Sequence, residues 1–466
     1  MDASRRGFIR GILASLGLGS LGGGCVFAAP PGWKPSRNAN IVLGVISDTH
    51  LRTEHGPGGR PDRNWPDKYF AAALEHFKVQ NVDAVVHCED FAHRGQVEEM
   101  LFHVQTWERV FPRSLTPDGH KVEKLFVTGN HDVEGASYGS FVAENYPDPD
   151  VRVKHVLQTD MAGNWEHIWG EKYEPVWHKE VKGYHFFGRN HSVSNEELMS
   201  CLKKWSKALT ESKARGRPFF YMQHFRPLGD TRDVLRRLCC GCIPMSFFGH
   251  NHWSASNWNV VSLYHGGLPC IQVPSCEPRG CHGLADDAWI TSGKLEKTPQ
   301  VGKGRQGYVV RVYDDMMVIE RREFAQGGIL GSNWVMPFGD RTPHPFSREG
   351  LKKVIGEPQF RDGAKLVVED SFASPHLCIK IPLADGNSKS RVYAYEVKVD
   401  GGGAPLLRAV YAAGCNLGMG HEPNGGTTTL VIEKSELPKG ENLTISVTPL
   451  SSLGTRGDSL KTKGMG

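Results

Sequence analysis

Apolar runs that stop abruptly at polar residues recur along the first half of this chain, and they constrain its fold more than any other feature. Five of them span residues 41–47, 82–87, 124–128, 218–223 and 243–248. Continuous apolar runs of this length are typical of strands that are buried on both faces. Stretches with helical spacing follow the first two runs, at 67–79 and 96–110. Strands that alternate with helices predict a layered α/β domain, whose sites lie just after the carboxyl ends of the strands.

The residues that follow these runs are types that bind transition metals. They form five motifs: Asp48-Thr49-His50, Asp90 with Gly95, Gly129-Asn130-His131-Asp132, a lone His224, and Gly249-His250-Asn251-His252. Carboxylates and neutral imidazoles are common ligands of divalent metal ions. In an extended segment His250 and His252 would point to the same face, whereas a sharp turn would direct them to two different ions. Each motif alone is weak evidence, because such residues are frequent at strand ends and on surfaces.

Taken in this order, the five motifs resemble those of the calcineurin-like metallophosphoesterase family over about residues 40–325. The resemblance implies a four-layer α/β/β/α sandwich that holds two divalent metal ions, and it makes Asp90 the bridging ligand. It places Asp48, His50 and His252 around the first ion, and Asn130, His224 and His250 around the second. The mixed ligand set suits manganese, iron or zinc without choosing among them.

The resemblance also implies a reaction. A hydroxide shared by the two ions would attack the phosphorus of a phosphoester, in line with the leaving oxygen. His131 would protonate or stabilise that oxygen, and Asp132 would orient the His131 imidazole. For Asp132 the alternative is a turn or cap residue. We expect hydrolysis of a phosphodiester, from a nucleotide or a lipid head group. The alternatives are phosphomonoester hydrolysis by the same site and a non-enzymatic surface-binding role.

Several positions depart from the family pattern. Glu89 stands where the family has a glycine before the bridging aspartate, which predicts either a reshaped turn or an extra acidic group near the metal ions. Phe91 and Ala92 follow Asp90, where purple acid phosphatases carry an iron-binding tyrosine, so a ferric–tyrosinate site is not expected. The segment from Ile46 to Leu51 is more similar to the cyclic-nucleotide phosphodiesterase type.

Arg94 is a candidate for contact with the phosphoryl group. Its spacing after Asp90 resembles the motif of serine/threonine phosphatases, in which an arginine holds phosphate, and a guanidinium suits phosphate oxygens. The alternative is a solvated arginine at a helix start, and the match is partial because His93 replaces an aspartate. His191, which follows a hairpin expected within 174–187, is the best of four further histidines for a substrate contact. The other three are His55, His87 and His93. For all four, an ordinary polar role is the alternative.

The N-terminal segment carries an export signal. Ser4-Arg5-Arg6-Gly7-Phe8-Ile9-Arg10 resembles the twin-arginine motif, and the glycine-rich apolar run after it offers a cleavage point at Ala28-Ala29. We therefore expect residues 1–29 to be a twin-arginine signal peptide, the export machinery to be a partner, and the protein to be periplasmic or secreted. A lipid anchor at Cys25 is the less favoured alternative. The glycines weaken any stable helix, so no stable membrane span is expected.

Composition narrows the remaining choices. The formal net charge is +4 without a basic block, so there is no signal for nucleic-acid binding, and we expect a small phosphoester substrate. Several cysteines flank the 249–252 motif, namely Cys239, Cys240, Cys242, Cys270, Cys276 and Cys281. Structural disulfides that brace this turn are favoured over a zinc knuckle, because regular Cys-x-x-Cys pairs are missing.

Domain boundaries follow from changes in pattern. The phosphoesterase-like domain is expected at 36–326 and a Gly- and Pro-rich linker at 327–350. Short alternating strands at 351–455 predict an all-β sandwich similar to a fibronectin type III domain, and a tail follows at 456–466. Within the first domain, the loop at 51–66 and an irregular insertion at 133–172 would shape access for the substrate.

Overall fold

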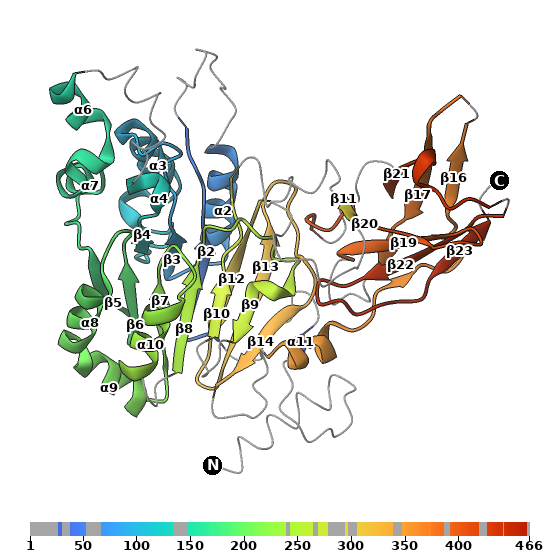
Figure 1. Ribbon diagram of the computed structural model, residues 1–466. Helices are drawn as coiled ribbons and strands as arrows, with labels where there is room; N and C mark the ends of the chain where they lie inside the picture. Colours follow the sequence, from blue (N-terminus) through green and yellow to red (C-terminus); the bar gives the residue numbers. More distant parts are fainter. Residues whose placement is uncertain are drawn as a thin grey trace, which may run out of the picture.

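The computed structural model of this 466-residue chain consists of an α/β unit with a β-rich unit beside it (Figure 1). The structure describes residues 27–29, 38–52, 67–133, 148–238, 243–263, 269–277, 294–296, 305–338, 347–371, 373–385, 392–418, 426–440 and 442–463. The last of these segments belong to the β-rich unit, drawn in orange to red in Figure 1.

The first sheet contains three of the strands predicted from the sequence. In sheet order its strands are β1 (Phe27–Ala29), β14 (Asn333–Pro337), β13 (Met316–Glu323), β12 (Gln306–Val312), β2 (Ile41–Ile46), β3 (Ala84–Cys88) and β4 (Glu123–Val127). β2, β3 and β4 are parallel, and β12 pairs with β2 antiparallel. Because β2, β3 and β4 are parallel, the loops that follow them leave the sheet at one edge.

The second sheet packs against the first. Its strands, in sheet order, are β5 (Val176–Val181), β6 (Tyr184–Arg189), β7 (Pro218–Met222), β8 (Ile243–Phe248), β10 (Pro269–Gln272) and β9 (Val261–Leu263). β6, β7, β8 and β10 are parallel, whereas β5 and β9 pair antiparallel at the two edges. A bridge between Ser47 and Ser275 joins the ends of β2 and β10, so both sheets open their carboxyl ends toward the same region.

Side chains on alternate strand positions divide between an inner and an outer core. Leu43 and Val45 of β2 pack in the core between the sheets, with Phe220 and Phe247 of the second sheet. The outer face of the first sheet is covered by α2 (Asp67–Val79), α3 (Val97–Val110) and α7 (Met161–Trp169). The outer face of the second sheet is covered by α8 (Asn195–Lys204), α9 (Ser206–Ala214) and α10 (Gly229–Leu238). The predicted four-layer α/β/β/α sandwich is therefore confirmed.

The C-terminal part is rich in strands, as predicted. One sheet is β11 (Lys294–Glu296), β20 (Leu406–Tyr411), β19 (Ala394–Asp400), β22 (Thr444–Leu450) and β23 (Leu460–Lys463). A smaller sheet is β16 (Val367–Asp370), β17 (His376–Pro382) and β21 (Thr427–Glu433), and a short pair is β15 (Gln359–Phe360) with β18 (Ala384–Asp385). Val397 and Val447 of the larger sheet share a buried core with Ile379 and Leu430 of the smaller one. α11 (Arg348–Ile355) precedes all of these strands except β11, and it packs into the core of the first unit.

Three segments differ from the sequence-based expectation. The stretch 327–350, expected as a linker, contains β14, whose Trp334 is fully buried between the sheets. The tail at 456–466 contains β23, which pairs with β22. The insertion at 133–172 is not irregular where it is described, because α6 (Pro149–His155) and α7 lie within it. In β14 and α7 the packing of buried apolar residues outweighs a composition typical of loops, whereas β23 is formed by pairing with β22 alone.

Most of the expected signal peptide, with Cys25, lies outside the described residues. β1 holds Ala28 and Ala29, which pair with Trp334 and Asn333, so the expected cleavage point falls within a strand. Among the helices that the structure describes, none has the length and apolar character needed to cross a membrane.

Two of the cysteines that flank the 249–252 motif are thiols rather than disulfides. Cys270 and Cys276 are free and buried, and burial raises the pKa of each to about 12. These two therefore do not brace the turn covalently, contrary to expectation. The remaining four, Cys239, Cys240, Cys242 and Cys281, lie outside the described residues, and for them a disulfide stays a prediction.

Candidate metal centre

The loops that carry the candidate ligands pass through left-handed backbone conformations. Positive φ angles occur at Asp48 (51°), His50 (44°), Glu89 (89°), Asp90 (51°), His250 (72°) and His252 (51°). Residues other than glycine rarely adopt this conformation, because it costs about 1–3 kcal/mol of conformational free energy for each residue. Such residues cluster at functional sites, where surrounding contacts hold the backbone in place. These turns let side chains two positions apart in one loop point in different directions.

Two glycines allow the loops to approach one another closely. A Cβ atom at Gly129 would lie 2.1 Å from Oδ1 of Asp90. One at Gly249 would lie 2.0 Å from Oγ of Ser47 and 2.6 Å from Oδ2 of Asp48. Only glycine fits at either position, and this explains the glycine that opens the motifs at 129–132 and 249–252.

The first group of candidate ligands is Asp48, His50 and His252, all buried. The Nε2 atoms of His50 and His252 lie 3.0 Å apart. Oδ1 of Asp48 lies 3.3 Å from Nε2 of His252 and 4.0 Å from Nε2 of His50. The backbone N–H of His250 donates to the Asp48 carboxylate at 3.1 Å, which ties the loop after β2 to the loop after β8.

The second group is Asp90, His224 and His250, with Asn130 beside it. Nε2 of His224 lies 2.5 Å from Oδ1 of Asn130, 3.0 Å from Nδ1 of His250 and 3.4 Å from Oδ2 of Asp90. The same Oδ2 of Asp90 lies 3.7 Å from Nε2 of His50 in the first group. Asp90 thus stands between the two groups, where a bridging ligand would stand. The structure brings all seven predicted ligands together.

These separations fit the coordination of metal ions. Ligand atoms lie about 2.0–2.2 Å from an ion such as zinc, so neighbouring ligands of one ion lie roughly 3 Å apart. Nitrogen–nitrogen separations of 3.0 Å occur in both groups, between His50 and His252 and between His224 and His250. Imidazole lone pairs that converge in this way repel each other unless a proton or a cation lies between them. The mixed donors fit manganese, iron or zinc.

Burial dominates the protonation of most of these groups. It lowers the pKa of His224 to about 3 and that of His50 well below its ordinary value, so both imidazoles are neutral, as metal ligands must be. Burial also raises the pKa of Asp90, helped by the charge of Asp48. For His252 burial is outweighed by Asp48 and Glu277, which raise its pKa to about 10. Burial likewise raises the pKa of Asp48, but the charge of His252 outweighs it and lowers that pKa to about 2.

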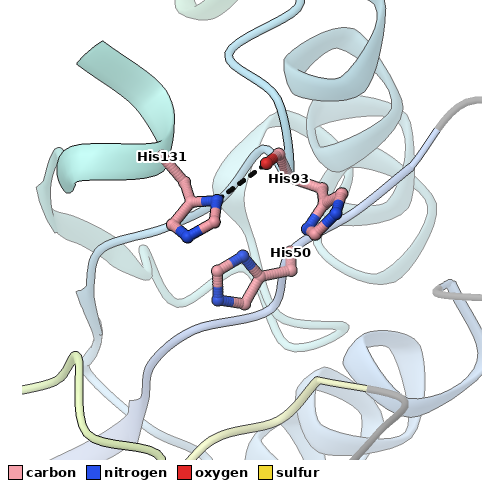
Figure 2. A group of neighbouring side chains, drawn as sticks. All are labelled: His50, His93 and His131. Carbon is pink, nitrogen blue, oxygen red and sulfur yellow. Dashed lines mark hydrogen bonds between the residues drawn. The ribbon is translucent and has the colours of Figure 1, made fainter. Parts of the chain in front are cut away.

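His131 lies beside the first group, but Asp132 does not orient it. Nδ1 of His131 bonds to the backbone carbonyl of His93 at 2.8 Å, as the dashed line in Figure 2 marks. The Asp132 carboxylate instead accepts the backbone N–H groups of Ala92 (2.8 Å) and Gly129 (2.9 Å). The expected role of Asp132 is therefore wrong in this structure. The alternative role, that of a turn residue, agrees better with the structure, because this buried carboxylate connects two loops that carry ligands.

Three imidazoles gather on this side of the site. His50, His93 and His131 have ring nitrogens within 4.8 Å of one another, and the rings surround a common space in Figure 2. The ring of His131 lies 4.5 Å from that of His50 and 5.6 Å from that of His93, centroid to centroid. Burial lowers the pKa of His131 although the His93 carbonyl acts in the opposite direction. His93 thus lies at the site, through both its carbonyl and its ring.

The other candidate residues occupy different places. Arg94 is half-buried in the loop before α3, and its backbone N–H donates to the carboxylate of Glu99 at 2.8 Å. The ring of His191 lies 6.2 Å from that of His224, at the edge of the second group. His87 is a core residue, stacked 4.1 Å from the ring of Phe91. His55 lies outside the described residues.

Sequence reasoning missed one residue of the site. Glu277 is fully buried, with Oε2 3.1 Å from Nδ1 of His252. Glu89 lies near the ligands, as one of the two alternatives for it predicts, and places Oε2 2.7 Å from Nδ1 of His224. Glu277 follows the apolar strand β10, so the strand-end pattern that found the other motifs could have found it too.

Comparison with known proteins agrees with this site. A model of the calcineurin-like phosphoesterase family matches residues 41–254, a segment that holds all seven candidate ligands. The match extends neither to Glu277 nor to the C-terminal β-sandwich. No curated protein matches the chain. The family match indicates a metal-dependent hydrolase of phosphoric esters, as the motifs predict.

Solved structures resemble the chain only distantly. A dimetal phosphatase from Danio rerio is 13% identical, covers 65% of this chain and 100% of its own, and has a TM-score of 0.36. A purple acid phosphatase from yellow lupin (Lupinus luteus) is 11% identical, covers 65% of this chain and 55% of its own, and has a TM-score of 0.40. The vacuolar protein sorting 29 protein from Cryptosporidium parvum is 11% identical, with coverages of 64% and 98% and a TM-score of 0.30. Likeness at this level carries no argument about activity.

Proposed function

We propose that this phosphoester hydrolase is a binuclear-metal phosphodiesterase that acts on a nucleotide or lipid head group outside the cytoplasm. One observation carries the proposal of two ions: the Oδ2 atom of Asp90 lies within 3.7 Å of a histidine nitrogen in each of two ligand groups. A single ion would need only one such group. When bound, two divalent ions would neutralise the phosphoryl oxygens and activate the attacking water.

The protein's own side chains would orient the ester and help its leaving group. His131 is the proposed proton donor to the leaving oxygen, because its ring lies 4.5 Å from that of His50 in the first ligand group and its Nδ1 is bonded to the His93 carbonyl. Arg94 is the proposed partner of a non-bridging phosphoryl oxygen. His191, at the edge of the second group, is proposed to contact the rest of the substrate.

The reaction is tested with two aryl esters. The metal-free protein would be loaded with manganese, iron or zinc and then given bis(4-nitrophenyl) phosphate or 4-nitrophenyl phosphate. We expect the diester to be hydrolysed with the higher kcat/KM. A strong preference for the monoester would replace the diester proposal with the phosphomonoesterase alternative, since the same ligands serve both.

The ligand assignment is tested by removing the bridging residue. Asp90→Ala should lower turnover more than about 100-fold. Loss of a residue that contacts a metal ligand from outside typically costs about 10–100-fold, and loss of a ligand itself should cost more. It should not unfold the domain, since Asp90 is a buried carboxylate beside the like charge of Asp48. Circular dichroism and a metal count per chain accompany the rate. Near-normal turnover in this variant would contradict the assignment.

Export is a separate part of the proposal and rests on residues 4–10 alone. Replacing Arg5 and Arg6 by lysine should leave the protein in the cytoplasm, whereas the unchanged chain should reach the periplasm or the medium. Cell fractionation with N-terminal sequencing of the exported form would measure both. The N-terminus found would also show whether β1 is kept, since the expected cleavage point falls within it.

A further inference from the structure

Two buried glutamates lie behind the candidate ligands without belonging to either group. The first, Glu277, has its Oε2 3.1 Å from Nδ1 of His252, whose Nε2 faces Asp48. Glu277 is held in place from its own loop. Its backbone N–H donates to Oγ of Ser275 at 2.9 Å, and this hydroxyl donates to the backbone carbonyl of Asp48 at 3.0 Å. The loop after β10 is thereby tied to the first ligand group.

Glu89 repeats the arrangement in the second group. Its Oε2 lies 2.7 Å from Nδ1 of His224, whose Nε2 faces Asp90 and Asn130. Glu89 is fully buried. Its φ of 89° is one that glycine adopts freely and that other residues adopt only under strain. A glutamate is held here despite that strain, and the contact with His224 gives its side chain a role.

We propose that Glu277 and Glu89 are positioning residues, one for each ligand group of the proposed metal centre. The carboxylate of each lies within 3.1 Å of Nδ1 of one histidine. Its negative charge there favours the tautomer with the proton on Nδ1 and leaves the Nε2 lone pair to a metal ion. Such outer carboxylates fix the ring orientation of a ligand and strengthen it as a donor. The inference rests on the proposed function, because it needs the two ions to be there.

The charges lead to the same conclusion. With Asp48 and Asp90, the two glutamates make a set of four carboxylates, none more than 1% exposed. Buried like charges repel one another. Two divalent ions would offset this negative charge, and the Arg52 guanidinium lies 3.9 Å from Oε1 of Glu277 as a further cation. The glutamates add negative charge behind the ligands, so they should increase the affinity of the centre for metal ions.

Metal affinity of the full-length protein tests the proposal directly. The metal-free protein would be titrated with Zn²⁺ against a competing chromophoric chelator, as wild type and as Glu277→Ala, Glu277→Gln, Glu89→Gly and Glu89→Gln. Each replacement should weaken one site by about 10–100-fold. Glutamine should do less harm than alanine or glycine, because its amide oxygen keeps a partial negative charge beside Nδ1. The visible absorption of the Co²⁺-loaded protein should also shift, since a ligand imidazole is reoriented.

Two variants separate positioning from general stability. Glu89→Gly removes the strain at φ 89°, so the metal-free protein should melt no lower than wild type while its metal affinity falls. Glu320 is a matched control, because it is buried in β13 and lies 3.6 Å from Arg311 rather than beside a ligand. Glu320→Gln should leave the metal affinity and the Co²⁺ spectrum unchanged.

Wild-type affinity and spectra in the Glu277 and Glu89 variants would overturn the proposal and leave the metal centre standing. An equal loss of affinity in Glu320→Gln would also overturn it, since the effect would then follow from any buried charge. If the wild-type protein itself bound no metal ion, the proposed function would fail, and this inference would fail with it.

Discussion

His250 and His252 lie two positions apart, yet they face different partners. Nδ1 of His250 lies 3.0 Å from His224, whereas Nε2 of His252 lies 3.0 Å from His50. Both histidines have positive φ, and this turn sends their side chains apart. The family resemblance assigns these two residues to different ions, but the residues alone leave open whether they share a face. The backbone angle decides that question, and it depends on contacts from three other loops.

Gly249 is the residue on which that turn depends most. In Gly249→Ala the new methyl group would lie 2.6 Å from Oδ2 of Asp48, so the carboxylate must move. We expect a loss of about 1–3 kcal/mol in stability and a clear loss of metal from the first group. Gly403→Ala is the control, because a Cβ there has no atom within 4 Å. Chemical denaturation and a metal count per chain measure both effects, and a fully loaded Gly249→Ala protein would contradict the argument.

His103 shows a histidine that serves the core rather than the site. It is fully buried on α3, with the Phe70 ring 4.0 Å away, and its ring nitrogens have no hydrogen-bond partner among the described residues. Burial lowers its pKa well below the ordinary 6.5. The unfolded chain therefore takes up a proton below about pH 6.5 that the folded protein does not. The contribution of neutral His103 to the free energy of unfolding is therefore fully present above that pH and is lost as the pH falls.

His103→Leu should remove this pH dependence. Below pH 6.5 the free energy of unfolding should fall less steeply than in wild type, by up to about 1.4 kcal/mol per pH unit. At pH 7 the variant should be about 1 kcal/mol more stable, because unpaired buried ring nitrogens are lost. Urea denaturation from pH 4.5 to 7.5 measures both quantities. Parallel curves for the two proteins would show that His103 does not titrate on unfolding.

At the scale of elements, the sequence predicts best where a segment's own pattern decides its structure. The apolar runs of β2, β3, β4, β7 and β8 are self-evident, and so is the helical spacing of α2 and α3. β14 cannot be recognised because its five residues lie within Gly- and Pro-rich sequence, and pairing with β13 and β1 makes them a strand. The same holds for the metal site. The sequence shows which ligand types stand at the strand ends. The groups beside Nδ1 of His131, His224 and His252 belong to other loops, so only the folded structure identifies them.

Asn190 links two segments that lie far apart in the sequence. Its Oδ1 accepts the backbone N–H of Thr128 after β4 (2.7 Å), and its Nδ2 donates to the carbonyl of Glu174 before β5 (2.8 Å). Asn190→Ala would leave the buried N–H of Thr128 unpaired, which should cost about 1–3 kcal/mol. Asn190→Asp keeps the acceptor for Thr128, but it buries a charge and directs a second oxygen at the Glu174 carbonyl, so it should cost at least as much. Chemical denaturation measures both variants, and an unchanged free energy of unfolding in Asn190→Ala would show that the Thr128 contact does not matter.

At the scale of the whole molecule, the β-sandwich packs against the segment that follows the metal ligands. Trp253, directly after His252, contacts the cores of both units. The backbone N–H of Trp258 donates to Oγ of Ser452 at 2.9 Å. Gln306 accepts the N–H of Ala255 (2.7 Å) through Oε1 and donates to the carbonyl of Asn416 (2.9 Å) through Nε2. The sandwich thus braces the residues that continue the 249–252 turn.

These contacts predict that the two units unfold together. Apolar side chains and buried hydrogen bonds shared across a boundary are lost from both sides when either side opens, so neither unit should have an independent transition. Calorimetry should give one thermal transition, coincident with those seen by circular dichroism and tryptophan fluorescence. Trp253→Ala, which removes the shared side chain, should lower the melting temperature and begin to separate the transition into two. Two transitions in the wild-type protein would instead mean that the sandwich is an independent neighbour and contributes nothing to the turn.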